Sequence, residues 1–490
     1  MARQKYSVRQ ALVLSFARKY TSLIFNVGTV VIVSRLLTPK EIGVFSVAVG
    51  LTALTQMLRT FGVSEYLVQA KTLTEGMIRT SFTVNLILGW VLAIGLFATS
   101  WLLGDFYGDP GVGRVIRVLS ATFFLTPFGT TAIALLQRDM AFGVLYKVGA
   151  GEVAVRSSVT IGLAYAGFSY MSMAWASLAA MVAWILGCTI WAHEYRARGL
   201  SLSEWRLMVP FGINRTISDV VSQVGMQSAN IVVGKMLGLA AAGFYSRGYS
   251  VVNIFRDKVI SAIGAVAFPA FAVEHREREA APELYLRSLV YLTGISWPFF
   301  AFSAFMAYPI IRILFGNQWD AAVPLMRWLC GAAIVGTLIY QCNQFFVAIG
   351  RAGTVTRVEI QYQLARLGIA IVAALYSVEA VAASQVLVYV IAVALYYRQM
   401  QDYDALAIGK CAKALLPSAV LTVATCMVPA VIVFWPGLVA RHMIPAAVVA
   451  AGGGGLGWLL GSMATKHPLM DEIRNMTSRF HGYLSGLQRL

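Results

Sequence analysis

The chain of 490 residues contains a long series of apolar segments of about 20 residues, separated by short polar connections. An α-helix rises about 1.5 Å per residue, so a segment of this length crosses the hydrocarbon core of a membrane. Fourteen segments qualify, near 9–35, 41–61, 79–103, 115–136, 147–168, 171–192, 207–234, 240–270, 287–312, 323–348, 356–376, 379–398, 414–434 and 443–463. Since a spanning segment must satisfy its backbone hydrogen bonds internally, the sequence predicts an all-α polytopic membrane protein.

Composition supports this fold class. Charged residues make up 12% of the chain, whereas soluble domains carry roughly 25%. Lys and Arg number 39 against 22 Asp and Glu, an excess that in a soluble protein would suggest a nucleic-acid partner. Here the excess lies in loops and within the apolar segments, so no nucleic-acid partner is expected. The five cysteines are isolated, which favours packing over metal or disulfide chemistry.

Loop charge predicts the orientation of the chain. Lys and Arg accumulate on the cytoplasmic side of membrane proteins. With a cytoplasmic N-terminus, the cytoplasmic segments hold 22 Lys and Arg and the outer loops hold 7. An even number of spans then places the C-terminus in the cytoplasm as well. The connections are too short for a domain outside the membrane.

An internal repeat predicts two lobes. Residues 34–46 align without gaps to residues 234–246, with Leu37/Leu237, Gly43/Gly243 and Ser46/Ser246 identical. This match predicts two pseudo-symmetric lobes of six spans, an arrangement found in transporters. The predicted parts are an N-lobe at 1–195, a cytoplasmic loop at 196–206, a C-lobe at 207–400, two further spans within 401–465, and a cytoplasmic amphipathic tail at 466–490.

Cations lie inside several of the predicted spans. A cation in the hydrocarbon region costs about 2.5 to 3.5 kcal/mol or more, so it usually faces a cavity or a partner. Polar residues recur at helical spacing in spans 1, 2, 7 and 8, which predicts that these spans line a positively charged chamber. The predicted chamber cations are Arg18, Arg59, Arg156, Arg215, Arg247 and Arg256, and the predicted polar lining is Asn26, Gln56, Asp219, Asn253 and Asp257.

Two of these arginines have a second interpretation. Arg59 lies about one turn from the inner end of its span and could instead extend to the interface. Arg215 and Asp219 are four residues apart and could simply neutralise each other. In span 11, Glu359 and Arg366 fit either a second pair in the chamber or a structural pair.

No catalytic or metal-binding pattern is present in the sequence. The five histidines lie in loops or tails, and none is close to a suitable Cys or carboxylate pattern. The outer loops are about ten residues long, too small for the catalytic part of a membrane polymerase or ligase. The sequence therefore predicts a protein that is not an enzyme and that holds no metal or cofactor.

Four patches of the sequence together resemble a known family. They are residues 29–69, LLQRDMAF at 135–142, residues 211–271, and ILFGNQWDAAVPLMRWL at 313–329. In this order and spacing they resemble the Wzx-type polysaccharide flippases of the multidrug/oligosaccharidyl-lipid/polysaccharide (MOP) exporter superfamily. The similarity is strongest to flippases for colanic acid, xanthan and succinoglycan, and it covers roughly residues 10–400.

The resemblance implies a function in the bacterial inner membrane. A flippase of this kind moves an undecaprenyl-diphosphate-linked oligosaccharide repeat unit from the cytoplasmic to the periplasmic leaflet by alternating access, between two lobes arranged as a V. In the related lipid II flippase, arginines on spans 1, 2 and 8 recognise the diphosphate, which points here to Arg18, Arg59 and Arg256. Membrane lipids, a polysaccharide polymerase and a co-polymerase are the partners implied.

The superfamily also leaves an alternative open. Many of its members couple transport to H+ or Na+, and no residue here identifies a coupling ion. A cation-coupled multidrug or small-solute antiporter is the alternative function. Such a transporter favours acidic residues in its cavity, whereas spans 1 and 2 carry cations in their interiors.

Overall fold

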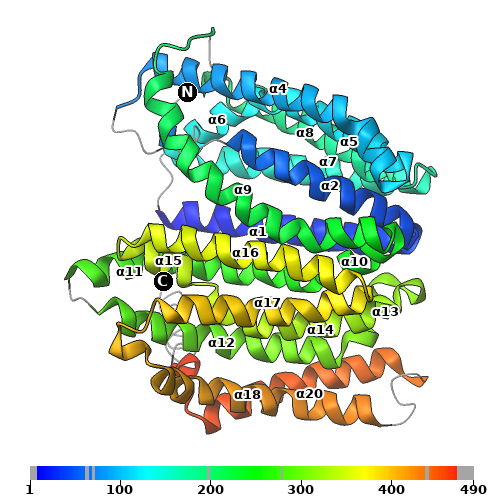
Figure 1. Ribbon diagram of the computed structural model, residues 1–490, viewed down its shortest axis with the longest axis vertical. Coiled ribbons are helices and arrows are strands. Elements are labelled where there is room, and N and C mark those ends of the chain that lie inside the picture. Colours follow the sequence, from blue (N-terminus) through cyan, green and yellow to red (C-terminus); the bar gives the residue numbers. More distant parts are fainter. Residues whose placement is uncertain are drawn as a thin grey trace, which may run out of the picture. The chain divides into compact units, whose positions relative to one another are not determined.

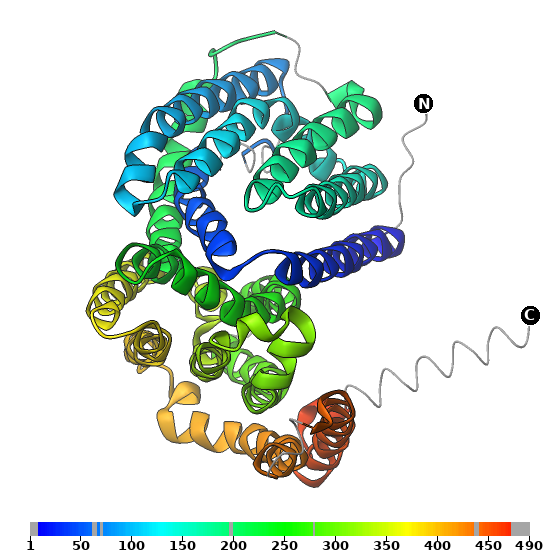
Figure 2. The ribbon, with the colours of Figure 1, turned by 90° about the vertical axis from the view of Figure 1, so that its right-hand side faces the viewer.

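The computed structural model describes residues 8–60, 66–68, 72–195, 199–277, 280–435 and 441–471. Regular structure in these residues is helical (Figure 1). The chain divides into two compact units, one of residues 1–246 with 370–375 and one of residues 247–369 with 376–490. Within each unit the helices lie alongside one another, lengthwise in Figure 1 and many of them nearly end-on in Figure 2.

The first unit follows the apolar segments closely. Its helices are α1 (Val8–Leu36), α2 (Pro39–Thr60), α4 (Glu75–Tyr107), α5 (Pro110–Leu125), α6 (Pro127–Arg138), α7 (Phe142–Tyr165), α8 (Met171–Trp191) and α9 (Trp205–Met236), and α10 (Leu239–Phe255) begins in it. Local sequence sets several of the ends. The side chain of Thr74 caps α4, Gly108 ends it at φ +66°, and Asp109 caps α5.

The second unit is less regular. A π-helical segment, η2 (Arg256–Ile260), follows α10. The other helices are α11 (Ser261–Glu277), α12 (Ala281–Phe305), α13 (Ala307–Phe315), α14 (Ala322–Gly336), α15 (Cys342–Ala348), α16 (Ala352–Ala374), α17 (Val378–Arg398), α18 (Ile408–Phe434) and α20 (Met443–Ala464). A core with fully buried Phe271, Tyr285, Phe345 and Phe346 packs α11, α12 and α15 together. Two predicted spans are interrupted helices in the structure: 240–270 corresponds to α10–η2–α11, and 323–348 corresponds to α14–α15.

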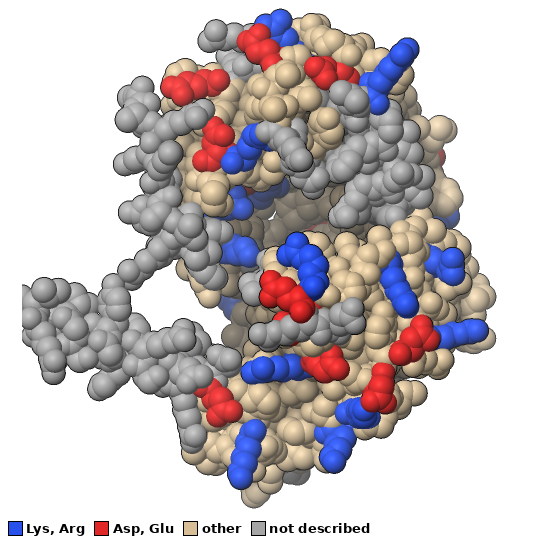
Figure 3. Space-filling model, turned by 90° about the vertical axis from the view of Figure 1, so that its left-hand side faces the viewer, with Lys and Arg blue, Asp and Glu red and all other residues tan. Residues whose placement is uncertain are grey.

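The helices confirm a polytopic membrane protein. In the part of the chain that the structure describes, eight helices are long and apolar enough to cross a membrane, or nine if the pair α5/α6, bent by 53°, counts as one. Helices α1, α7 and α16 overlap predicted spans but fall short of this criterion, and each carries charged residues within its length. Charge is thus concentrated on particular helices. On the face of the molecule drawn in Figure 3, side chains of both charges lie at the surface.

The two copies of the internal repeat are in direct contact within the first unit. Ser46 Oγ donates a hydrogen bond to Ser246 Oγ at 2.8 Å, across an offset of 200 residues. A Cβ added at Gly43 would overlap the carbonyl oxygen of Leu239, and one added at Gly243 would overlap that of Pro39. Because Pro39 and Leu239 are themselves repeat-equivalent, each repeat makes the same contact with the other. Helices α2 and α10 therefore meet about a local pseudo-twofold axis, with backbone against backbone.

The start of the predicted tail belongs to the packed structure. His467 is fully buried, and its ring nitrogen lies 3.0 Å from Ser418 Oγ on α18. Its ring also covers Gly294 on α12, where a Cβ would collide with it. The burial of His467 ties the end of α20 to α12 and α18, and the predicted surface tail can begin only after it. Residues 472–490 lie outside the described residues.

Candidate functional site

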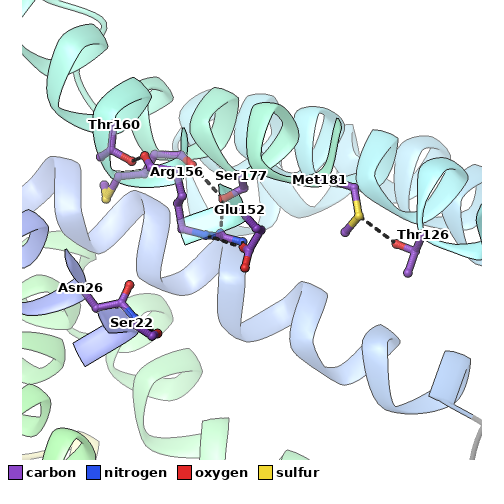
Figure 4. Close-up of polar contacts among 9 residues, drawn as sticks. Ser22, Asn26, Thr126, Glu152, Arg156, Thr160, Ser177 and Met181 are labelled. Carbon is purple, nitrogen blue, oxygen red and sulfur yellow. Dashed lines mark hydrogen bonds and ion pairs between the residues drawn. The ribbon is translucent and has the colours of Figure 1, made fainter. Parts of the chain in front are cut away.

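Helices α1, α7 and α8 bring together the first group of polar residues. Arg156 on α7 donates from Nε to Glu152 Oε1 at 3.2 Å, and from Nη1 to Ser177 Oγ on α8 at 3.4 Å (Figure 4). Asn26 on α1 donates to Ser22 Oγ at 3.0 Å, one turn away. The predicted cation at Arg156 is therefore offset by a carboxylate on its own helix, and its guanidinium is anchored to α8.

Arg18 is the unpaired cation of this group. Its Cδ lies over Gly149 of α7, and its side chain is exposed. Arg18, Ser22 and Asn26 are four residues apart, so they share one face of α1. Within the described residues the Arg18 guanidinium has no hydrogen bond or ion pair. Its charge is therefore available to a ligand.

Arg59 lies near the end of α2 and is only 7% exposed. Its Nε is buried and has no hydrogen-bond partner among the described residues. A buried polar atom without a partner costs about 1–3 kcal/mol, and more when it is charged. Gln56, one turn earlier, is exposed. The burial of Arg59 does not favour the interpretation that its side chain extends to the interface.

Arg256 lies at the beginning of the π segment in the second unit. Its Nη1 donates to Tyr249 Oη at 3.0 Å, and its Nε lies 3.4 Å from Oδ1 of the adjacent Asp257. The side chain remains 23% exposed. One turn before it, Asn253 has a buried Oδ1 without a hydrogen bond among the described residues. Short π segments occur frequently at functional sites, because they change which way the following side chains face.

Arg247 has a different environment from the other arginines. It is 8% exposed, and its guanidinium carbon lies 5.6 Å from the centre of the Trp319 ring and 5.8 Å from that of Phe315. These rings stabilise the cation by cation–π interactions and cover it. The side chains of Arg215 and Asp219, on α9, lie outside the described residues.

Sequence reasoning missed the tyrosines that surround the cations of the second unit. Arg366 on α16 lies 5.0 Å from the ring centre of Tyr389 and 5.7 Å from that of Tyr362. It donates to Gln363 Oε1 at 3.2 Å, and Gln363 donates to Glu359 at 2.9 Å. Tyrosines in the middle of spans, away from the interfaces where they are usual, were the available signal.

Near the ends of predicted spans, by contrast, two cations are paired with carboxylates. Lys40 Nζ lies 3.0 Å from Asp109 Oδ2, and Arg312 makes bonds of 2.8 and 2.6 Å to the two carboxylate oxygens of Asp320. The hydrogen bonds from Arg312 outweigh burial and lower the pKa of Asp320 below its usual value. No group of His, Cys, Asp or Glu within the described residues could hold a metal ion.

Comparison with known proteins places this arrangement in a family. The family described as polysaccharide biosynthesis protein matches residues 32–324. The chain is 24% identical over 330 residues to the lipopolysaccharide biosynthesis protein WzxC of Escherichia coli (strain K12), covering 65% of each chain. It is 25% identical over 320 residues to the succinoglycan biosynthesis transport protein ExoT of Rhizobium meliloti (strain 1021), covering 65% of this chain and 64% of that one. The matches thus span just under two thirds of these relatives' own length.

Solved structures share the fold. The lipid II flippase MurJ in an inward closed conformation matches 94% of this chain and 100% of its own, with a TM-score of 0.76 and 11% identity. An inward-facing multidrug resistance MATE family transporter of the MOP superfamily matches 79% of this chain and 95% of its own, with a TM-score of 0.61 and 17% identity. At these identities the likeness concerns the fold alone.

The names of the curated relatives describe polysaccharide biosynthesis and transport, in agreement with the prediction that the chain is not an enzyme. The match to residues 32–324 covers more than half of the chain. The chain is therefore a multi-pass membrane protein with a MurJ- and MATE-like fold, and it belongs to the polysaccharide biosynthesis protein family, alongside Wzx-type relatives.

Proposed function

We propose that the protein is a flippase for a lipid-linked oligosaccharide. Its substrate is an undecaprenyl-diphosphate-linked repeat unit, which it moves from the cytoplasmic to the periplasmic leaflet. Arg18, Arg59 and Arg256 bind the diphosphate during transfer. Arg18 carries this proposal, because an exposed guanidinium without an ion pair among the described residues lies within a helix that overlaps a predicted span.

The chemistry of the cargo supports the proposal. Taking several phosphate charges out of water into hydrocarbon costs tens of kcal/mol in a Born picture. Arginine suits this task because its planar group binds phosphate oxygens in pairs and stays charged in proteins. The relatives named for lipopolysaccharide and succinoglycan biosynthesis handle polysaccharides, and the polyprenyl tail can remain in the lipid.

The finer architecture belongs to the same proposal. Fourteen spans form two six-span lobes in a V around a cationic cavity, with two further helices, α18 and α20. Both termini lie in the cytoplasm, the protein lies in the bacterial inner membrane, and the cavity opens alternately to either side. A polysaccharide polymerase and co-polymerase receive the product.

Drug antiport is the weaker alternative. Export of cations calls for carboxylates in the cavity, but the one acidic residue of α1 and α2 is Glu41. Its Oε2 accepts 2.7 Å hydrogen bonds from the Thr38 backbone and hydroxyl. Glu41 thus caps the start of α2 in a capping box.

Alanine variants test the proposed anion site. Arg18→Ala, Arg59→Ala and Arg256→Ala should each lose surface polysaccharide in cells whose own flippase is deleted, while the protein still reaches the membrane. Lysine at the same positions should keep part of the activity, because the charge remains and the two-pronged contact is lost. The exposed outer residue Arg114, changed to alanine, is the matched control. Full export by the triple alanine variant at a normal protein level would falsify the proposal.

A further inference from the structure

The second unit contains a cluster of three tyrosines around two arginines. We propose that Tyr249, Tyr340 and Tyr389, backed by Arg366, form a subsite that binds the saccharide part of the cargo through its hydroxyl groups. This inference rests on the proposed function, because it assigns the sugars to residues other than the arginines that bind the diphosphate.

Contacts within the unit connect the cluster. Tyr249 Oη accepts the 3.0 Å hydrogen bond from Arg256, and Tyr389 lies against the Arg366 guanidinium at 5.0 Å. The hydroxyl of Tyr389 also interacts with Tyr340. Helices α10, α16 and α17 and the turn after α14 thus each contribute one member.

Exposure divides the tyrosines of this unit into two sets. Tyr285, Tyr362 and Tyr396 are buried, and their hydroxyls are engaged by the protein, with Tyr362 and Tyr396 donating to Glu359 at 2.9 and 3.3 Å. Tyr249, Tyr340 and Tyr389 are partly exposed. The first set holds the helices together. Each residue of the second set keeps part of its surface accessible, so it can contact a ligand.

Unpartnered polar atoms point to a ligand that carries both donors and acceptors. Arg366, 6% exposed, has a buried Nε without a hydrogen bond among the described residues. The buried Oδ1 of Asn253, one turn from Tyr249, is an acceptor in the same condition. Buried polar groups are normally paired, so such a collection calls for partners.

Charge favours sugar over phosphate at this position. Arg366, the one cation assigned to the subsite, is linked through Gln363 to Glu359. This carboxylate offsets its charge, which leaves the subsite close to neutral. Phenol and amide groups both donate and accept hydrogen bonds, as the hydroxyls of a sugar do. Phenol rings also offer flat apolar faces at little cost in conformational entropy.

Single Tyr→Phe changes test the subsite, because each removes one hydroxyl and keeps the ring. The full-length protein carrying Tyr249→Phe, Tyr340→Phe or Tyr389→Phe is compared with Tyr376→Phe, whose exposed side chain lies at a helix end outside the cluster. Two probes are measured in detergent: undecaprenyl diphosphate without sugar, and the repeat-unit-bearing lipid extracted from cells that lack their flippase. Tyr340→Phe and Tyr389→Phe should each bind the sugar-bearing lipid about 3- to 10-fold more weakly and bind the sugar-free lipid unchanged. Tyr249→Phe should weaken binding of both lipids, and that of the sugar-bearing lipid by the larger factor, because its hydroxyl also holds Arg256.

The two proposals fail in different ways. Equal weakening for both lipids, or no weakening for either, overturns the saccharide subsite. If the triple alanine variant of Arg18, Arg59 and Arg256 still binds the sugar-free lipid normally, the diphosphate site itself is wrong, whatever the tyrosine variants do. If a single variant does not fold, the double change Tyr340→Phe/Tyr389→Phe, which keeps both rings, is measured in its place. The ratio of its affinities for the sugar-bearing and the sugar-free lipid then tests the subsite.

Discussion

Helices α2 and α10 are equivalent in the internal repeat, yet they differ beyond the residues where they touch. Gly43 and Gly243, and Ser46 and Ser246, make matching contacts within the first unit. Beyond that point α2 continues as a regular helix to Thr60, whereas α10 gives way to a π segment at Arg256. The repeat therefore fixes how the two helices cross but not the course of each helix beyond the contact.

The cations also occupy different positions in the two copies. By the offset of 200, Gln56 corresponds to Arg256 and Val47 to Arg247. The start of α2 is capped by Thr38 and Glu41, while α10 follows Gly238 at φ +93°. Pseudo-symmetric packing thus supports an asymmetric arrangement of charge. Such an arrangement suits a cargo with a charged end and a neutral end, as the proposed substrate has.

The largest effect is expected from the glycines of the contact. Gly43→Val and Gly243→Val should each abolish folded protein, because the new side chain would overlap a backbone carbonyl of the other helix. Fluorescence-detected size-exclusion chromatography measures the folded yield. Gly95→Val on α4 is the control, since nothing lies within 4 Å of its added Cβ. If one of the two glycines tolerates valine, the contact is not symmetric.

A cross-link should stop export reversibly. Ser46→Cys with Ser246→Cys places two thiols where the hydroxyls now lie 2.8 Å apart. Oxidation should join them, and export should fall to background if alternating access separates these helices; a reducing agent should restore it. The five native cysteines are buried, and the single Ser46→Cys variant serves as the control. Full export by the cross-linked protein would show that this contact stays closed throughout transport.

A moderate effect is expected from the ion pair that only the first repeat has. Burial raises the pKa of Asp109, but the Gly111 N–H and Lys40 outweigh it, so the pKa lies below its usual value. The folded state thus favours the carboxylate, and this stabilisation is present above about pH 4 and lost as the pH falls through the lowered pKa. Asp109→Ala should cost about 1 kcal/mol at pH 7, where it also removes the α5 cap, and less at pH 3.

Thermal unfolding at the two pH values measures this difference. Ala240, exposed at the position equivalent to Lys40, provides the control, because Ala240→Lys should leave the melting temperature unchanged. A loss of stability in Asp109→Ala that is as large at pH 3 as at pH 7 would leave the cap, and not the charge, as its cause.

The smallest effect is expected at Arg247. Replacing a buried cation by an apolar residue of similar size is often neutral or stabilising. Arg247→Met should therefore keep its melting temperature and its export, because Phe315 and Trp319 already cover the guanidinium. Loss of export at a normal protein level would instead place Arg247 among the residues that contact the cargo.

The sequence predicted the fold class well, whereas the surroundings of the candidate site residues came from the structure. Apolar length locates α4, α8, α17 and α20 closely, because a helix in lipid needs little beyond about 20 apolar residues. The same criterion could not reveal the π segment at Arg256, since that break depends on packing around it. It also could not separate Arg18, which is exposed, from Arg247, which is enclosed by aromatic rings.

By itself the sequence determined that the chain is helical and crosses the membrane many times, that a segment of 13 residues recurs at an offset of 200, and that cations lie inside apolar segments. These properties follow from hydropathy and periodicity, which are read along one chain. Tertiary structure alone decided that Arg156 is bound to Ser177, that His467 is buried against Ser418, and that Tyr389 lies against Arg366. Several of these partners come from helices far apart in the sequence, so no local pattern encodes them.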